Sequence, residues 1–245
     1  MRIQIYAINL DRSADRWERL SQQASDLDLN LVRVPGVDGL QVSTGERVDC
    51  DEQAFRRNNG RAILSGEYGC YRSHLKALST FLDSGQSIGL IIEDDIELTS
   101  QFLPRVEAAV AALPPRADII KLCNHRLVWF RSVAVSSMGD EIGRAAHGPQ
   151  GSTACYAITR AGAINLAAAL ARMEYPWDVA LERGWANGTE VYSTRENVAN
   201  LARHKTTIAN RAAYKATKFP WWKRFRTYAH RAQESARRIS YALRG

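Results

Sequence analysis

The stretch GLIIEDDIEL, residues 89–98, joins an apolar run directly to three adjacent acids. Leu90, Ile91 and Ile92 have the continuous branched character of a buried strand, and Glu93–Asp95 follow at its carboxyl end. Adjacent carboxylates repel one another, and removing them from water costs further free energy. A bound divalent cation or simple exposure in a turn would each relieve these costs, so the surrounding sequence has to decide between them.

Strand and helix patterns alternate on both sides of this stretch, which predicts an α/β fold. Residues 2–10 predict a first strand, 14–27 a helix, and 30–39 a second short strand with a Gly-rich turn. The further predicted elements are a loop with a short helix over 41–65, a helix over 65–85, the strand 88–92, a helix from Thr99 or Ser100 to Pro114, a strand over 117–124, two short strands or a hairpin over 126–135, a strand followed by an Ala-rich helix over 152–173, a helix over 174–185 and a strand over 189–198.

Polar segments follow three of the predicted strands. These segments are Asn9–Arg12, Val37–Gly39 and Glu93–Asp95. In open α/β sheets, ligands bind outside the carboxyl ends of the strands. We therefore expect the three segments to converge on one ligand site.

The overall composition is that of a folded soluble protein, with 45% apolar and 24% charged residues. No uncharged apolar run approaches the roughly 20 residues of a membrane-spanning helix. The first residues show no apolar core of a signal peptide. Four scattered cysteines predict reduced thiols in a cytoplasmic protein and no structural zinc site.

Basic residues are concentrated at one end of the chain. Residues 1–202 carry 21 basic and 25 acidic residues, whereas residues 203–245 carry 12 basic residues and one acidic residue, Glu234. We therefore predict a mildly acidic domain over 1–202 and a basic, aromatic-rich tail over 203–245.

The acidic triplet has three possible interpretations. The first is a solvated turn or a charge cluster at a helix N-terminus. The second is the phosphoacceptor pocket of a receiver domain, but that pocket follows the first strand and needs another Asp at the end of a later strand, where this chain has Cys123 and Asn124. The third is a metal site for a sugar nucleotide, in which Glu93 and Asp95 bind Mg²⁺ or Mn²⁺ through hard oxygen ligands.

Five short motifs, in order, resemble the family 25 glycosyltransferases, bacterial lipopolysaccharide and lipooligosaccharide enzymes related to collagen galactosyltransferases. They are INLDRSADRWERL, RVPGVDG, GEYGCYRSHLKAL, IIEDDIEL and GSTACYAITRAGAINL followed by PWD, and they extend over roughly residues 2–200. The resemblance implies a GT-A fold over 1–202, with a single Rossmann-like mixed sheet flanked by helices. It also implies inverting transfer, most often from UDP-galactose, to a sugar or hydroxyl acceptor.

Under this resemblance, the donor sugar nucleotide would be bound near the ends of the first strands. Arginines there offer paired hydrogen bonds to phosphate, although exposed helix-face positions and ordinary turn chemistry remain alternatives. The predicted donor-binding residues are Asn9, Asp11, Arg12, Arg16, Asp38, Ser73, His74, Glu93, Asp94, Gly151 and Ser152.

An inverting transferase also needs a general base within reach of the acceptor hydroxyl. Asp178, which follows Pro176 and Trp177, is the candidate, and Trp177 would stack on an acceptor sugar. Glu182 lies one helical turn later and could exchange roles with Asp178. The alternative for Asp178 is an acid at a helix start.

The tail mixes tryptophan, phenylalanine and tyrosine with many basic residues. From Trp221 onward it predicts a basic amphipathic helix at an anionic membrane surface. Nucleic-acid binding and simple packing on the domain are the alternatives, and the acidic body disfavours nucleic acid.

Together these features predict a peripheral enzyme on the cytoplasmic face of the inner membrane. It would transfer a hexose from a UDP-sugar to a lipid-linked lipopolysaccharide or lipooligosaccharide core acceptor with a divalent metal. A nucleotidyltransferase and a non-catalytic sugar-nucleotide-binding homologue are the alternatives.

Overall fold

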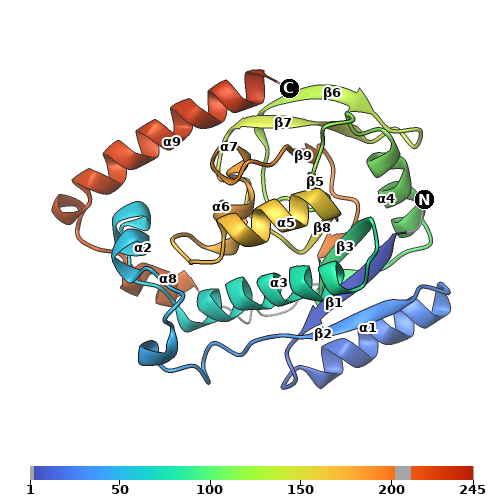
Figure 1. The fold of residues 1–245 in the computed structure, drawn as a ribbon, viewed down its shortest axis with the longest axis horizontal. Coiled ribbons are helices and arrows are strands. Elements are labelled where there is room, and N and C mark those ends of the chain that lie inside the picture. The colour runs from blue at the N-terminus through green and yellow to red at the C-terminus, as the bar shows by residue number, and fades with distance from the viewer. Residues whose placement is uncertain (1–2, 202–210, 245) are drawn as a thin grey trace.

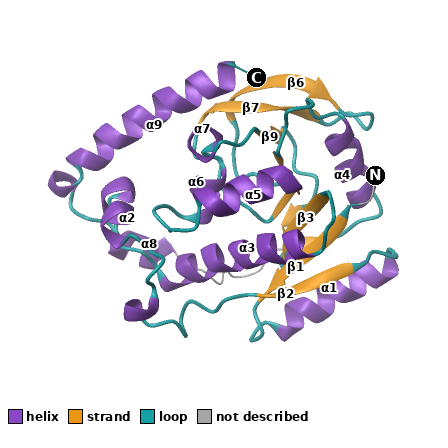
Figure 2. Cartoon of the chain, viewed as in Figure 1, coloured by secondary structure: helices purple, strands orange, loops and turns teal. Residues whose placement is uncertain are grey.

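A computed structural model describes residues 3–201 and 211–244. Its centre is an eight-stranded sheet with both parallel and antiparallel neighbours, so the predicted mixed α/β class is confirmed (Figures 1 and 2). In spatial order the strands are β2 (Leu31–Pro35), β1 (Gln4–Asn9), β3 (Ile88–Glu93), β8 (Cys155–Thr159), β5 (Ile119–Lys121), β9 (Val191–Thr194), β7 (Glu141–His147) and β6 (Val128–Val135).

Helices lie on both faces and at the margins of this sheet (Figure 1). A two-stranded sheet, β4 (Ile96–Glu97) with β10 (Asn200–Leu201), lies beside the acidic triplet. The helices are α1 (Ala14–Asp26), α2 (Glu52–Asn59), α3 (Ser65–Asp83), α4 (Phe102–Ala111), α5 (Arg160–Ala169), α6 (Trp177–Leu181), α7 (Gly184–Asn187), α8 (Arg211–Thr217) and α9 (Phe225–Leu243), with 3₁₀ turns at Thr44–Glu46 and Trp221–Lys223.

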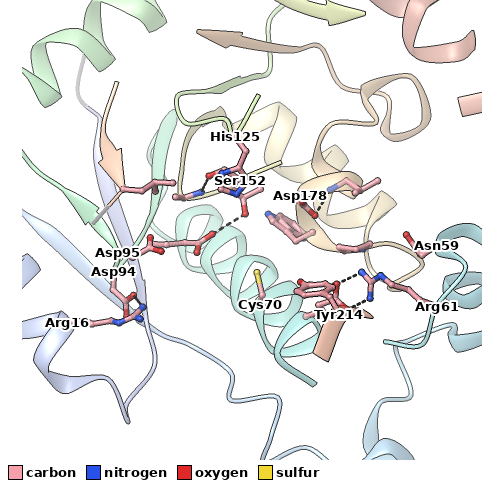
Figure 3. A pocket seen from close by; sticks show the side chains of 18 of the residues that line it. Arg16, Asn59, Arg61, Cys70, Asp94, Asp95, His125, Ser152, Asp178 and Tyr214 are labelled. Atoms are coloured by element: carbon pink, nitrogen blue, oxygen red, sulfur yellow. Dashed lines mark hydrogen bonds and ion pairs between the residues drawn. The ribbon is translucent and has the colours of Figure 1, made fainter. Parts of the chain in front are cut away.

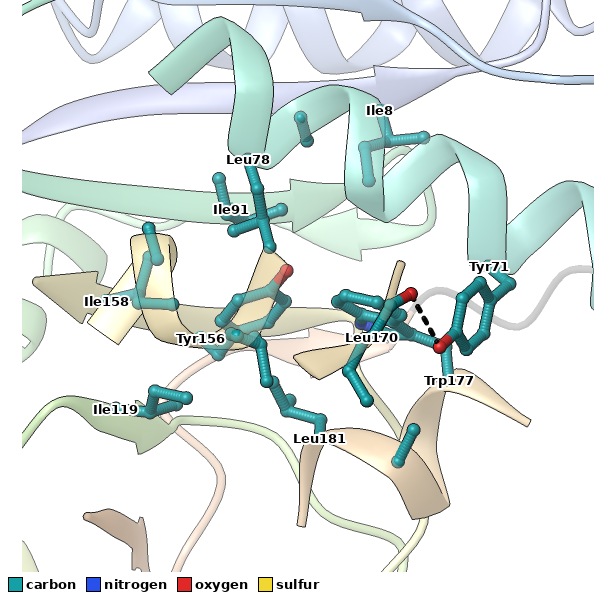
Figure 4. Packing of buried hydrophobic residues seen from close by; sticks show 14 of the residues in the cluster. Ile8, Tyr71, Leu78, Ile91, Ile119, Tyr156, Ile158, Leu170, Trp177 and Leu181 are labelled. Carbon is teal, nitrogen blue, oxygen red and sulfur yellow. Dashed lines mark hydrogen bonds between the residues drawn. The ribbon is translucent and has the colours of Figure 1, made fainter. Parts of the chain in front are cut away.

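Alternation along the central strands divides the core into two layers. In β1, Tyr6 and Ile8 join the cluster formed with α3, α5 and α6, whereas Ile5 and Ala7 join the cluster formed with α1 and α4. Successive strand side chains point to opposite faces and both faces are buried, so β1 is continuously apolar from Ile5 to Ile8. Figure 4 shows part of the first cluster, in which the Tyr71 hydroxyl also donates to the Leu170 carbonyl at 2.9 Å.

The sheet topology brings the predicted ligand edge together. β1 pairs in parallel with both β2 and β3, and β8 runs antiparallel between β3 and β5. The carboxyl ends of β1, β3 and β5 therefore share an edge with the beginning of β8. Asn9 and Glu93 end their strands at this edge, as the sequence predicted.

One β-hairpin differs from the prediction. Residues 128–135 form the single strand β6, and its partner is β7, which the sequence did not predict. β7 contains Gly143, where a Cβ atom would lie 1.9 Å from the Arg131 carbonyl oxygen, and the buried Arg144. The Arg144 guanidinium lies 4.2 Å from the ring centroids of both Tyr192 and Tyr241, which compensates its burial. Because Gly143 and the buried Arg144 stand in β7, its sequence lacks the alternation of apolar and polar residues that predicts a strand.

The C-terminal helix α9 crosses the outer side of the molecule and contacts β7, α2 and α7 (Figure 1). The predicted helix in the tail is confirmed, although the predicted boundary at 202/203 borders residues outside the described ranges. No helix within 3–201 or 211–244 has the length and apolar character needed to cross a membrane.

Candidate active site

A cavity of about 620 Å³ opens at the predicted ligand edge of the sheet (Figure 3). Asp94 and Asp95 lie on one side of it, Asp178 lies on the other, and Glu93 also belongs to its lining. The remaining lining comes from α1, α2 and the residues after it, α3, the segment after β5, the segment before β8, α6 and the proline before it, β10, α8 and α9. These residues are Arg16, Asn59, Arg61, Glu67, Cys70, His125, Ser152, Thr153, Ala154, Pro176, Trp177, Val179, Leu201, Tyr214 and Arg231.

Asp94 is held by the beginning of the chain. Asn9 Nδ2 donates to Asp94 Oδ2 at 2.7 Å, and Arg16 donates to Asp94 Oδ1 at 3.1 Å. Arg19 donates to the Asp94 backbone carbonyl at 3.0 Å. The Asp94 carboxylate is therefore paired, and its hydrogen bonds hold the acidic triplet against β1 and α1.

Glu93 is embedded in a polar group at the end of β3. Its Oε1 lies 3.3 Å from His74 Nε2 and accepts from the Thr153 hydroxyl at 3.1 Å. Burial would raise the pKa of Glu93, but the hydrogen bond and charge of His74, together with the Thr153 hydroxyl, outweigh it and lower this pKa. His74 in turn stacks on Trp177 with ring centroids 5.0 Å apart. Glu93 therefore stays ionised and fixed in orientation.

Asp95 is the poorly compensated member of the triplet. Burial, followed by the charges of Glu93 and Asp94, raises its pKa to about 7. Its Oδ1 atom is buried and finds no hydrogen-bond partner within the described parts of the chain. A buried carboxylate oxygen without a partner, next to a second ionised carboxylate, suits a hard divalent cation. Asp95 and Glu93 therefore have the donor chemistry that the predicted Mg²⁺ or Mn²⁺ requires.

A second set of possible ligands shares Glu93. One ligand atom from each of Cys70, His74 and Glu93 lies within 4.8 Å of the others. Burial raises the pKa of the Cys70 thiol well above its ordinary value, so the thiolate that binds metals is disfavoured. His74 Nδ1 is also 3.2 Å from the Tyr156 hydroxyl. This set suits a hard cation less well than the two carboxylates.

A smaller cavity of about 70 Å³ adjoins the first and shares Cys70, Glu93 and Asp94 with it. Arg12 and Asp38 line it and form an ion pair at 2.9 Å. Its floor depends on close backbone contact between the 37–39 turn and α3. A Cβ atom on Gly39 would lie 1.8 Å from the Ser65 carbonyl oxygen. Glycine is required there because no side chain fits between the two segments.

Ser73 and His74 line this smaller cavity, and both residues are buried. Ser73 Oγ accepts from the Val37 backbone N–H at 2.8 Å and donates to the Gly69 carbonyl at 2.7 Å. Asp38 Oδ1 also accepts from the Leu40 N–H at 3.0 Å, which is ordinary turn chemistry. These residues shape the cavity as well as lining it.

Asp178 in the first turn of α6 and Glu182 just after its end have different environments. Asp178 lines the large cavity, and burial, followed by the charge of Glu182, raises its pKa. Glu182 is fully buried and lies outside the residues that line the cavity. It pairs with Lys121 at 2.7 Å and Arg238 at 3.1 Å, and it accepts from the backbone N–H groups of residues 150 and 151. Asp178 is thus the member of the pair that faces a ligand space.

The segment before β8 connects these two regions. Gly151 and Ser152 have positive φ angles of 70° and 59°, and Ser152 lines the cavity whereas Gly151 packs against His125. Of the other predicted donor residues, Asp11 is an exposed partner of Arg33 and lines neither cavity. Trp177 is 2% exposed, with one face stacked on His74, so the predicted stacking of Trp177 on an acceptor sugar is not supported.

Several lining residues were missed by the sequence analysis. Thr153 adjoins the predicted Ser152, and His125 follows β5, so their places on the ligand edge could have drawn attention to them. Arg61 pairs with Glu67 and lies 5.2 Å from the ring centroid of Tyr214, which comes from the tail. No local pattern connects these distant segments, and only folding brings them together.

The fold and the site define an α/β protein with an acidic ligand cavity at the carboxyl edge of its sheet. The family model described as glycosyltransferase family 25 (LPS biosynthesis protein) matches residues 2–181. The chain belongs to glycosyltransferase family 25, which confirms the resemblance seen in the motifs.

Similar proteins are found in animals. An Aedes aegypti glycosyltransferase 25 family member is 30% identical over 106 residues, which are 42% of this chain and 18% of that protein. Zebrafish (Danio rerio) procollagen galactosyltransferase 1 is 29% identical over 108 residues, 42% of this chain and 18% of that protein. The human protein named inactive glycosyltransferase 25 family member 3 is 26% identical over 172 residues, 67% of this chain and 28% of that protein. The chain thus spans less than a third of the length of these relatives.

Proposed function

We propose that this protein is a metal-assisted, inverting glycosyltransferase with a GT-A arrangement. It transfers a hexose, galactose first among the candidates, from a UDP-sugar to a lipopolysaccharide or lipooligosaccharide core acceptor. The observation that carries the proposal is the cavity that Glu93 helps to line, with Asp95 on one side and Asp178 on the other. Family membership supports glycosyl transfer, and the names of the procollagen galactosyltransferases support galactose.

The donor would occupy the two adjoining cavities. The smaller one, with Asp38 and Arg12, would accept the uridine, because a carboxylate can accept from the ribose or base and a guanidinium can donate. The diphosphate would then lie at the shared wall, near Glu93 and Arg16. Glu93 and Asp95 would hold Mn²⁺ or Mg²⁺, which when bound supplies positive charge beside the departing diphosphate.

Asp178 would act as the general base from the opposite side of the cavity. Its carboxylate takes the proton of the acceptor hydroxyl, whose oxygen forms a bond to the anomeric carbon as the bond from that carbon to the diphosphate oxygen breaks. The electron pair leaves with the nucleoside diphosphate, and configuration inverts because attack comes from the opposite face. A raised pKa makes Asp178 a stronger proton acceptor than an ordinary aspartate.

The first test measures thermal stability with UDP, GDP, CMP and ADP, each with and without Mn²⁺. A ligand that binds only the folded protein raises its melting temperature. We expect a shift with UDP that requires Mn²⁺ and disappears in Asp95→Asn. Transfer of labelled galactose from UDP-galactose is then measured with lipooligosaccharide core acceptors. Absence of any nucleotide shift would contradict the proposal.

A non-catalytic sugar-nucleotide-binding role is the second candidate, because one human relative is named inactive. Both candidates predict UDP binding, so only turnover separates them. Hydrolysis of UDP-hexose or transfer of its sugar by the wild type, and loss of that activity in Asp178→Asn, would exclude the non-catalytic role. A nucleotidyltransferase using the same acids would instead release diphosphate from a nucleoside triphosphate.

A further inference from the structure

The C-terminal helix presents an unusual arrangement of polar and apolar faces. The side of α9 that faces the body is mostly polar up to Arg238: Arg238 pairs with Glu182, Glu234 pairs with Arg183, and the Thr227 hydroxyl donates to the Arg57 carbonyl at 2.8 Å. An ordinary surface helix buries its apolar stripe and exposes its polar face. α9 departs from this arrangement.

That outer face carries an apolar stripe. It begins with the aromatic cluster, defined as Trp221, Trp222, Phe225 and Tyr228, whose first three members are 61%, 58% and 62% exposed. The ring centroids of Trp221 lie 6.1 Å from Trp222 and 5.9 Å from Phe225, so the cluster is continuous. The stripe continues at helical spacing along α9 through Phe225, Tyr228, Ala232, Ala236, Ile239 and Leu243.

Positive charge surrounds the aromatic cluster. From Tyr214 to Arg231 the sequence contains six basic residues and no acidic residue. Lys215, Lys218, Lys223 and Arg226 are exposed. Exposed tryptophan and phenylalanine beside lysine and arginine match the headgroup region of an anionic bilayer, where aromatics enter the interface and basic groups meet phosphate.

The same helix reaches the active-site cavity. Arg231 lines the cavity from α9, and its guanidinium donates to the Asn59 carbonyl at 3.1 Å. Tyr214 lines it from α8, seven residues before Trp221 in the sequence. The outer stripe and the cavity therefore lie on two sides of one helix, which is about 10 Å across.

We propose that α9 and the aromatic cluster form an interfacial anchor that lies flat on an anionic lipid bilayer and holds the cavity next to the membrane surface. A lipid-attached acceptor would then reach Asp178 while its lipid stays in the bilayer. This second statement rests on the proposed glycosyl transfer, whereas lipid binding itself does not. At about 1.5 Å per residue, the stripe from Phe225 to Leu243 extends for about 27 Å along the surface.

The test is co-sedimentation of the full chain with phosphatidylcholine vesicles that contain or lack phosphatidylglycerol. We expect binding only to the anionic vesicles, weakening as salt rises. The variant Trp221→Ser, Trp222→Ser, Phe225→Ser should bind at least about tenfold more weakly, because three interfacial side chains are lost. The variant Lys215→Gln, Lys218→Gln, Lys223→Gln should lose binding and its salt dependence together.

The matched control is Val48→Ser with Ile164→Ser, which removes two exposed apolar side chains elsewhere and should leave vesicle binding unchanged. Transfer to a soluble acceptor should be equal in all these proteins, so failure of the anchor and failure of the proposed activity are distinguishable. No binding to anionic vesicles would overturn the anchor. So would tight binding of a single-stranded oligonucleotide that the aromatic variant loses, since that outcome assigns the surface to nucleic acid.

Discussion

Two regions of this protein hold carboxylates away from water in opposite ways. Behind the loop at 148–152, Glu182 is surrounded by Lys121, Arg238 and two backbone N–H groups; we call these three side chains the buried ion cluster. In the cavity, Asp95 and Asp178 have raised pKa values because burial and neighbouring acids are not offset. The two cavity acids are kept at a cost to the folded state, whereas Glu182 is compensated internally.

The difference separates structural from chemical carboxylates. A buried charge that is fully paired holds segments together, and removing its partner leaves an unpaired charge. A buried acid without compensation is destabilising unless a ligand, cation or proton completes it, which is why such groups mark functional sites. Glu182 and Asp178 lie one helical turn apart, yet they fall on different sides of this division.

The largest expected effect concerns Asp178. Asp178→Asn should lower transfer by about 10²–10⁴-fold, because the acceptor proton then has no base. UDP binding with Mn²⁺, measured by thermal shift, should be unchanged. The control is Glu174→Gln, a nearby acid outside the cavity lining. Retained transfer in Asp178→Asn would mean that the base lies elsewhere.

Breaking the buried ion cluster should lower the stability of the protein. Glu182→Gln leaves Lys121 and Arg238 without their counter-charge, so the free energy of unfolding in urea should fall by about 3–5 kcal/mol. The control Glu52→Gln breaks an exposed pair with Arg56 and should cost about 0–1 kcal/mol. Similar small losses of unfolding free energy in both variants would show that the buried ion cluster does not stabilise the fold.

Removing the charge of Asp95 should raise the stability of the folded protein, whereas removing the charge of Glu182 should lower it. Its folded pKa of about 7 exceeds the ordinary 3.8, so between these values the folded state binds more protons than the unfolded state and stability falls as pH rises. In EDTA, Asp95→Asn should therefore melt higher than the wild type at pH 8, with the difference shrinking toward pH 4. A variant that melts lower at pH 8 would place Asp95 among the structural carboxylates.

The smallest effect tests the loop between the two regions. Gly151→Ala and Gly188→Ala both force a side chain into a positive φ, which should cost about 1–2 kcal/mol in each. Only the first adds a Cβ atom 2.8 Å from His125, whereas the second meets open space. Gly151→Ala should therefore lower transfer and Gly188→Ala should not. Equal transfer activity in both variants would show that the loop at 148–152 does not contribute to the site.

Much of the ligand edge was predictable because it depends on short-range patterns. Apolar runs fixed the strands ending at Asn9 and Glu93, and parallel pairing then brings Asp94 and Asn9 into contact. β7 was not predicted because Arg144 and Gly143 interrupt its alternation. Arg144 is tolerated inside because Glu190 pairs with its guanidinium and because Tyr192 and Tyr241, from other elements, pack against it. Burial of a charge depends on distant partners that no local window contains.

Local sequence patterns were enough to predict the α/β class, the acidic triplet at the end of a strand, the family motifs and the basic amphipathic helix. Each of these follows from periodicity or from neighbouring residues. Three features depend on how the chain folds. Glu182 is buried while Asp178 faces a cavity, Tyr214 and Arg231 of the tail line that cavity, and the apolar stripe of α9 faces outward. The physical reason is that burial and pairing of charge are set by segments far apart in the chain, which meet only when the protein folds.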